Sequence, residues 1–398
     1  MPSTQTRRRF LAACGAACLG AVAGCLGSDG GRDAAADAAG DRTDWPTAGH
    51  DAANTNYVPG ANTIRSVSEV RRVDNRLGSA QPVVADGTLY LVGDTLRALD
   101  VDSGETRWEV APEDGQGNFW AAPTVRGGTV YVANGHQRVH AIDAASGERR
   151  WTAAVDVGSY VTPRLDEDGE AVYVGGEGHV SRLDPETGEK EWTHDLFGQV
   201  RQSVAVRRGV VYAVTEGGEL YALDEYGDGY WRVDLPAKCQ TPPTLAGRQV
   251  FVGTFDGFIH AVDTTRANLA WSTEVGGFAQ GGIAVADGTV YADGGRKLHA
   301  LDVDSGEKRW AFDVGTTGDH TPVVAGDTVF TTGDRLYGLK PSGGFSNGSI
   351  RQEALRFSHL TGGYAGPMNV ADGRVYVTAR LGDAEGNQTT TLLVLEPS

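Results

Sequence analysis

The sequence predicts an all-β fold built from repeats, and three observations predict it. A tryptophan ends the same short phrase every 39 to 43 residues, as in LDVDSGETRW, IDAASGERRW and LDPETGEKEW. Short runs of alternating apolar residues lie between these tryptophans, separated by Gly and Asn turns, which is typical of antiparallel strands. A fixed period of this length indicates a repeat architecture. No long segment has helical periodicity, so all-helical solenoids are excluded.

Residues 121–155 show what one repeat contains. Apolar-alternating runs occupy Pro123–Val125, Val130–Ala133 and Val139–Ile142, and a fourth run surrounds Trp151. Gly and Asn, which favour tight turns, separate the runs. One repeat is therefore expected to form an antiparallel meander of four strands.

The repeat occurs eight times. The half-phrase xPxV…G…VYV begins near Gln81, Ala122, Thr162, Gln202, Thr241, Gly281, Thr321 and Gly366. The seventh unit is degenerate, with Lys340 in place of Asp and an insertion at Ser342–Ile350, and the eighth ends at Leu392–Glu396 without its last strand. A spare strand, Glu69–Asp74, precedes the first repeat and can complete the eighth, which removes the open sheet edge. The sequence thus predicts an eight-bladed β-propeller of four-stranded antiparallel blades over residues 44–398, closed by an N-terminal strand.

The aspartates of the repeats open turns that end in glycine, as in Asp100–Gly104, Asp143–Gly147, Asp184–Gly188 and Asp302–Gly306. An Asp side chain accepts backbone N–H groups within its own turn, and Gly tolerates positive φ. Calcium ligation or acid catalysis is the alternative. Recurrence once per repeat favours the turn role.

The phrase A-x-D-x-x-[ST]-G-x-x-x-W resembles the pyrroloquinoline-quinone (PQQ) type repeat. The segment Asp44-Trp45-Pro46, followed by Asp51 and Tyr57, resembles the start of the small BamB-like members of that family. The resemblance implies a propeller over about residues 44–398, and it is far more specific for fold than for function. It also implies that tryptophans dock neighbouring blades, which here are Trp108, Trp151, Trp192, Trp231, Trp271 and Trp310.

The N-terminus is similar to a twin-arginine lipoprotein signal peptide, predicted over residues 1–25. Arg7, Arg8, Phe10 and Leu11 fit the export motif. The apolar stretch that follows, Phe10–Val22, suits a signal region and is too short to cross a bilayer as a helix. The stretch leads to a lipobox-like sequence that ends at Cys25, the expected lipidation site. Residues 26–43 are rich in Asp, Gly and Ala and are expected to form a flexible tether. An uncleaved basic tail is the alternative.

The chain is strongly acidic. It has 52 Asp plus Glu against 35 Lys plus Arg, a net charge of −17, and only five lysines. This pattern resembles haloarchaeal proteins adapted to high salt; a GC-rich genome is the alternative. The charge disfavours nucleic acid as a partner.

The four cysteines are Cys14, Cys18, Cys25 and Cys239. Once the signal is removed and Cys25 is lipidated, Cys239 has no partner, so no intrachain disulfide is expected. No metal-binding motif is present in the sequence.

Two function classes follow. The resemblance implies, as one possibility, a PQQ-dependent dehydrogenase of alcohols or sugars that binds PQQ with calcium. Such enzymes clamp PQQ with a vicinal disulfide, whereas Cys239 lies between Lys238 and Gln240, and no Asp can be assigned as the base. The favoured interpretation is a monomeric, lipid-anchored platform without a cofactor or catalytic residues. It would face outward from the cytoplasmic membrane and bind a cell-surface or membrane protein, a glycan or a small ligand.

The loops that lead into the innermost strands gather at the mouth of a propeller channel. They hold large polar-tipped side chains, unlike the small residues of the other turns. Ser79 and Cys239 occupy such positions, and the candidate ligand or partner site comprises Trp120, Tyr160, Arg201, Gln202, Gln240, Gln280, Asp319, His320 and Tyr364. The alternative is that these side chains only plug the channel.

Overall fold

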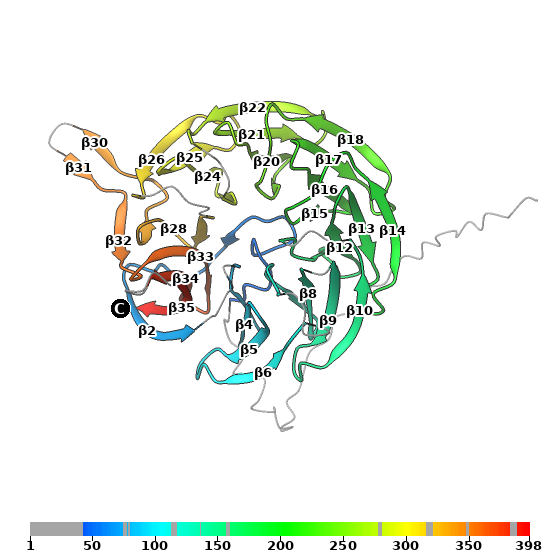
Figure 1. The fold of residues 1–398 in the computed structure, drawn as a ribbon. Coiled ribbons are helices and arrows are strands. Elements are labelled where there is room, and N and C mark those ends of the chain that lie inside the picture. Colours follow the sequence, from blue (N-terminus) through cyan, green and yellow to red (C-terminus); the bar gives the residue numbers. More distant parts are fainter. Residues whose placement is uncertain are drawn as a thin grey trace, which may run out of the picture. The chain divides into compact units, whose positions relative to one another are not determined.

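A computed structural model of the chain shows eight four-stranded sheets arranged in a ring (Figure 1). It describes residues 43–398, except 75–77, 79, 113–117, 136, 157–159, 278–280, 316–320, 348–349 and 383–387. These described residues contain no helix, and so none that could cross a membrane. Within each sheet every strand pairs antiparallel with its neighbours, apart from one short added strand. The predicted eight-bladed β-propeller is confirmed.

The strands follow the predicted repeats. In blade order, with the innermost strand first, they are β3 Val83–Ala85, β4 Thr88–Val92, β5 Leu96–Asp100, β6 Thr106–Val110; β7 Thr124–Arg126, β8 Thr129–Asn134, β9 Arg138–Asp143, β10 Arg149–Ala154; β11 Arg164–Leu165, β12 Val172–Gly175, β13 His179–Leu183, β14 Lys190–Asp195; β15 Ala205–Arg207, β16 Val210–Val214, β17 Glu219–Leu223, β18 Gly229–Asp234; β19 Thr244–Ala246, β20 Gln249–Gly253, β21 Phe258–Asp263, β22 Asn268–Glu274; β23 Ala284–Ala286, β24 Thr289–Gly294, β25 Lys297–Asp302, β26 Lys308–Asp313; β27 Val323–Ala325, β28 Thr328–Thr332, β29 Leu336–Leu339, β32 Leu355–His359; and β33 Tyr364–Ala371, β34 Arg374–Gly382, β35 Gln388–Pro397, β2 Val67–Asp74.

Three details depart from the plain repeat. The insertion in the seventh blade forms a separate hairpin, β30 (Phe345–Asn347) and β31 (Ile350–Gln352), which projects outward from the ring in Figure 1. A two-residue strand, β1 (Tyr57–Val58), adds in parallel to the inner edge of β27. Strand β2 pairs antiparallel with β35 and completes the eighth blade, as predicted.

The hydrophobic core lies between neighbouring blades. One buried cluster, for example, joins Val83 and Leu96 of the first blade to Val125, Val130 and Ile142 of the second. The middle strands are buried on both faces, so they are almost continuously apolar, whereas the outer strands alternate between half-buried and exposed positions. Burial of apolar surface between blades is thus the main force that holds the ring together.

Each of the six repeated tryptophans donates a hydrogen bond to the next blade. The indole Nε1 of Trp108 lies 2.8 Å from the carbonyl oxygen of Ala144, in the turn between β9 and β10. Trp192 makes the same bond to Glu225 at 2.9 Å. The other four tryptophans repeat the contact at 2.8 to 3.1 Å, with Pro185, Thr264, Val303 and Pro341 as acceptors.

A glycine in the receiving turn makes this contact possible. Gly147 has a φ of +76°, and a Cβ there would lie 2.9 Å from the Trp108 ring. The Asp that opens the turn fixes its shape: Asp143 Oδ1 accepts the backbone N–H and the hydroxyl of Ser146 at 2.9 and 3.0 Å. An ion pair with Arg150 holds the pKa of Asp143 far below its ordinary value, together with these hydrogen bonds. The hydrogen bonds are those that the turn interpretation predicts.

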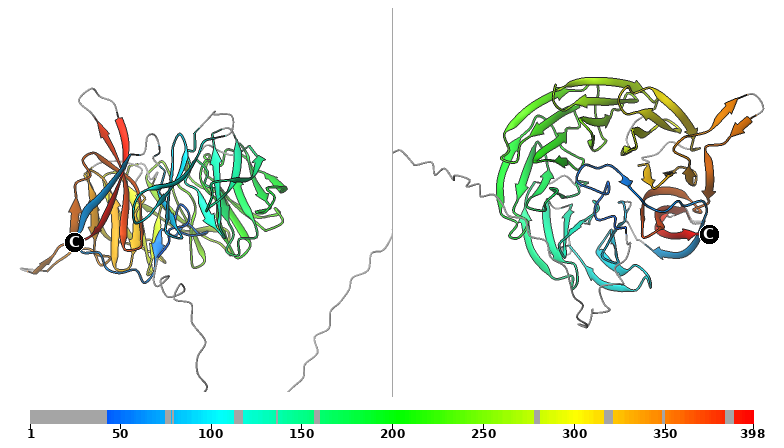
Figure 2. Two further views of the ribbon diagram at one scale, coloured as in Figure 1. Left: turned by 90° about the horizontal axis from the view of Figure 1, so that it is seen from below. Right: turned by 180° about the vertical axis from the view of Figure 1, so that it is seen from behind.

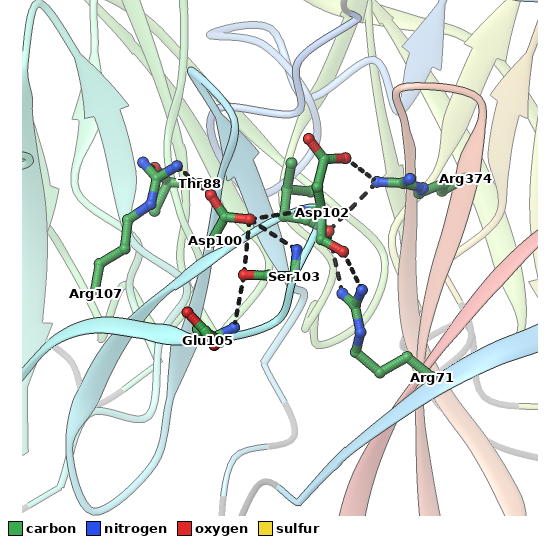
Figure 3. Close-up of polar contacts among 9 residues, drawn as sticks. Arg71, Thr88, Asp100, Asp102, Ser103, Glu105, Arg107 and Arg374 are labelled. Carbon is green, nitrogen blue, oxygen red and sulfur yellow. Dashed lines mark hydrogen bonds and ion pairs between the residues drawn. The ribbon is translucent and has the colours of Figure 1, made fainter.

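At the seam between the eighth and first blades, Arg71 takes the place of tryptophan. Arg71 follows a β-bulge in β2, as Trp108 does in β6, and its side chain lies against Gly104 of the first blade. Its guanidinium donates to the carbonyl oxygens of Val101, at 3.2 Å, and Asp102 (Figure 3). Arg374 adds ion pairs to Asp102 and Glu396, both at 2.8 Å. The closing seam is therefore polar where the six others described above use an aromatic ring.

Replacing Trp192 with Ala is expected to destabilise the protein by about 3 kcal/mol, the lower end of the range for a buried aromatic, because the ring is half-buried. Chemical denaturation followed by fluorescence measures the change. Asp184→Asn, in the turn of the same blade, is the control and is expected to cost less, since the amide keeps one acceptor oxygen. An unchanged midpoint for Trp192→Ala would show that the ring does not dock the blades.

Candidate functional site

The segment from Thr43 to Val58 runs through the centre of the ring and contacts the inner strands of the blades in turn (Figures 1 and 2). The inner strand of a blade has a sheet neighbour on one side only, so its other edge carries unpaired backbone groups. Six of the inner strands donate one N–H each to this segment, at 2.7 to 3.0 Å. The donors are Val84, Val125, Val206, Leu245, Val285 and Val324, and the acceptors are the carbonyl oxygens of Trp45, Pro46, Ala52, Ala53, Thr55 and Asn56.

The third and eighth blades contact the segment in other ways. The turn after β33 donates from the Asp372 N–H to Thr43 O at 3.0 Å. The third blade supplies Arg164, whose side chain is only 1 % exposed. Its Nη1 donates to Thr47 Oγ1, Ala48 O and Asp51 O at 2.8, 2.9 and 3.0 Å, and its Nη2 donates to Asn54 Oδ1. All eight blades are thereby tied to one stretch of chain.

Burial lowers the pKa of Arg164 to about 10, although the nearby Asp51 carboxylate opposes the shift. Arg164 therefore remains charged at neutral pH. For Asp51, burial alone would raise the pKa, but hydrogen bonds from His50 and Thr55 bring it below the ordinary value. The centre of the ring thus contains a buried cation with a carboxylate close by.

Sequence reasoning did not single out Arg164, although a signal was present. The equivalent position in the other seven repeats holds a small or uncharged side chain: Val83, Thr124, Ala205, Thr244, Ala284, Val323 and Asn369. A single charged residue at this position of the innermost strand is a departure that a repeat-by-repeat comparison reveals. The role of the segment before Val58 was missed for another reason: its partners are spread over the whole chain.

A cavity of about 420 Å³ lies above this segment, and we call it the cup. Ala48, Gly49, Asn54, Asn56 and Arg164 contribute to its floor. Five of the predicted mouth residues line its wall and rim: Trp120, Tyr160, Arg201, Gln202 and Gln240. The channel is therefore closed by the protein's own N-terminal segment and opens on the face where loops enter the inner strands.

The other predicted site residues have different positions. Tyr364 begins β33, is 64 % exposed and does not line the cup. Cys239 is buried in the core between the fourth and fifth blades, and its thiol donates to Gly253 O at 3.0 Å. Ser79, Gln280, Asp319 and His320 lie outside the described residues, as do Cys25 and the export-signal residues Arg7, Arg8, Phe10 and Leu11.

The rim of the cup combines aromatic and charged side chains. The rings of Trp120 and Tyr160 lie 6.3 Å apart between centroids, tilted by 54°. Arg201 forms an ion pair with Glu216 at 3.0 Å and donates to Gln199 Oε1 from Nε and Nη2 at 2.9 and 2.6 Å. Tyr160 and Trp120 are 59 % and 37 % exposed and lie next to each other at the rim, and adjacent exposed aromatic side chains are typical of binding surfaces.

A family model described as "Outer membrane protein assembly factor BamB" matches residues 34–177, 176–280 and 273–344. The chain belongs to this family. No curated protein gives a significant match.

Several solved structures are similar in fold. The quinohemoprotein alcohol dehydrogenase from Comamonas testosteroni superposes with a TM-score of 0.71 at 16 % identity, over 89 % of this chain and 80 % of that one. BamB from Moraxella catarrhalis gives 0.66 at 17 % identity, over 83 % and 98 %. A europium-containing methanol dehydrogenase gives 0.70 at 11 % identity, over 89 % and 98 %. At these identities the likeness concerns the fold alone.

The dehydrogenase neighbours raise the question of whether the cup fits PQQ and calcium. Calcium takes six to eight oxygen ligands, mostly carboxylates and carbonyls, yet no Asp or Glu side chain is among the described residues that line the cup. Nor do the described parts of the chain contain a cluster of three or more metal-binding side chains. Burial raises the pKa of the Cys239 thiol to about 11, and this cysteine lies in the core. The described residues of the cup do not fit a PQQ–calcium centre.

Arg164→Leu is expected to destabilise the protein by about 3–5 kcal/mol, because several buried oxygens and the Asp51 carboxylate lose their cationic partner. Arg201→Leu is the matched control, since its side chain is half exposed, and it is expected to cost no more than about 1 kcal/mol. Denaturation midpoints, with limited proteolysis of residues 43–58, measure both effects. Equal midpoints for the two variants would contradict the role given to Arg164.

Proposed function

We propose that this protein is an exported, lipid-anchored and non-catalytic binding platform whose cup binds a ligand or partner at the outer face of the cytoplasmic membrane. The observation that carries the proposal is the position of the chain where it enters the ring. Thr43 and Asp44 bond to the turns that follow two inner strands, where they accept hydrogen bonds from the N–H groups of Asp372 and Asp86. The cup opens on the opposite face of the ring, where the loops lead into the inner strands.

This arrangement suits a tether that leads from a lipid. Residues 26–43 would link a lipidated Cys25 to the ring through Thr43, whose contact with Asp372 lies on the face opposite to the cup. A flexible tether of that length has a root-mean-square span of roughly 23 Å. The propeller would remain near the membrane, with Trp120 and Tyr160 facing outward to a cell-surface or membrane protein or to a smaller ligand.

The family description and the fold neighbours give unequal support to the two candidate functions, a non-catalytic platform and a PQQ-dependent dehydrogenase. The BamB description suggests a role with membrane protein assemblies, which agrees with a platform. The dehydrogenase neighbours suggest PQQ-dependent oxidation of alcohols or sugars, but they support it by fold alone. The composition of the cup favours the platform, because its described residues supply neither a carboxylate base nor a rigid clamp for a cofactor ring.

The proposal predicts that Cys25→Ala moves the protein from the membrane fraction to the soluble fraction, and that the purified full chain neither retains PQQ nor oxidises substrates. The first outcome is expected because the lipid is the anchor. Cell fractionation measures it. Gel filtration after incubation with PQQ and calcium, followed by dye-linked oxidation of alcohols and sugars, measures the second.

Two results would contradict the proposal. If a Cys25→Ala variant stayed in the membrane pellet, Cys25 would not be the membrane anchor. Stoichiometric retention of PQQ with turnover would make the protein a dehydrogenase, particularly if Trp120→Ala abolished turnover at an unchanged melting temperature.

A further inference from the structure

We infer that the ligand of the cup is a neutral saccharide, bound by the Trp120–Tyr160 pair and by the side-chain amides of Gln202 and Gln240. This inference rests on the proposed function and names the chemical class that the site recognises.

The aromatic pair offers an apolar surface at the rim of the cup. Trp120 lies against the backbone of Gly135, in the turn after β8, where a Cβ would come within 3.2 Å of the indole Nε1. The glycine therefore lets the indole lie close to the turn, and Tyr160 approaches from the neighbouring loop. One face of a sugar ring presents C–H groups that pack on an aromatic face, and the phenol hydroxyl of Tyr160 can bond to sugar hydroxyl groups.

The amides provide donors and acceptors that no described residue uses. Gln202 and Gln240 are half-buried in the wall of the cup, and their side chains have no hydrogen-bond partner among the described residues. A primary amide donates two hydrogen bonds and accepts two. Such groups match neighbouring hydroxyls of a sugar, each of which both donates and accepts.

The floor adds two buried polar atoms that lack a partner in the described chain, Arg164 Nε and Asn56 Oδ1. Native proteins seldom leave such atoms unsatisfied. One is a donor and the other an acceptor, and both are buried rather than open to the cup, so they add polar character to its floor. A hydroxyl-rich ligand fits this pattern better than an apolar one.

The charges favour a neutral ligand. The described lining contains no carboxylate that would attract a cation. Its two arginines have counter-charges nearby, Glu216 at 3.0 Å from Arg201 and Asp51 close to Arg164. The chain as a whole carries −17, which repels polyanions at long range. The cavity of about 420 Å³ falls within the range of small-molecule sites and suits about two sugar rings.

The test uses the purified full chain and a panel of neutral disaccharides: maltose, cellobiose, lactose, mannobiose and chitobiose. Alanine tripeptide serves as the non-saccharide probe. Titration calorimetry and tryptophan fluorescence are expected to show saturable binding of at least one disaccharide, with a Kd between about 10 μM and 1 mM. The affinity is expected to change little between low and high salt, because no net charge is neutralised.

Variants locate the site. Trp120→Ala and Gln240→Ala are each expected to weaken binding at least about tenfold, as for central residues of an interface, without a change in melting temperature. Tyr226→Ala is the matched control, because this tyrosine is 72 % exposed but lies in the turn between β17 and β18, away from the cup. Its binding constant is expected to equal that of the parent.

Three outcomes would overturn the inference: no disaccharide binds up to about 10 mM, binding is unaffected by Trp120→Ala, or the peptide binds in the cup and the sugars do not. The last outcome would assign the cup to a protein partner. If no sugar binds while Cys25→Ala still releases the protein and PQQ is not retained, the saccharide inference fails and the platform remains.

Discussion

Apart from β27, which β1 also joins, the innermost strand of each blade has a strand neighbour on one side only, and its other edge faces the axis of the ring. An unpaired N–H group in such a position costs free energy when it is buried away from water. In this protein the segment before Val58 supplies a carbonyl oxygen to six of these edges, while Arg164 and the Thr43–Asp372 contact connect the other two blades. The same stretch of chain that satisfies the inner edges also forms the floor of the cup. The depth and chemistry of the candidate site therefore depend on how the centre of the ring is closed.

The outer part of the ring is held in a different way. Six tryptophans each combine a packed ring with one hydrogen bond across the blade boundary. Five of the rings approach a turn glycine, whereas the turn that receives Trp231 has Ala267 at positive φ instead. The seam between the last and first blades uses Arg71 and Arg374 instead (Figure 3). Half-exposed ion pairs contribute little stability and are screened by salt. Closure consequently depends on the backbone ladder between β2 and β35, which extends from Val67 to Asp74, and on the buried apolar cluster that joins Leu89 and Leu99 of the first blade to Val375 and Leu393 of the last.

Repetition explains how much the sequence could predict. The period of the Trp phrase and the missing last strand of the eighth unit were sufficient for blade number, strand order and the closing role of Glu69–Asp74, because each is a local pattern or a count. Five residues of the mouth were also predicted from their loops. Arg164 and the floor were not, since Arg164 bonds to residues 110 to 117 positions away. Such contacts follow from closure of the ring, which no single repeat encodes. The same reasoning failed for Cys239, whose loop position resembles that of Gln240 but whose side chain turns into the core.

The central claim is that residues 43–58 form a permanent floor that satisfies the inner edges of the blades. Residue-resolved hydrogen–deuterium exchange of the purified full chain tests it most directly. The amides of Val125, Val206, Leu245, Val285 and Val324, which donate to this segment, are predicted to exchange as slowly as the ladder amides of the adjacent second strands. Exchange of these five amides at the rate of exposed loop amides would show that the floor is open in solution, and would contradict the account of the cup that is built on it.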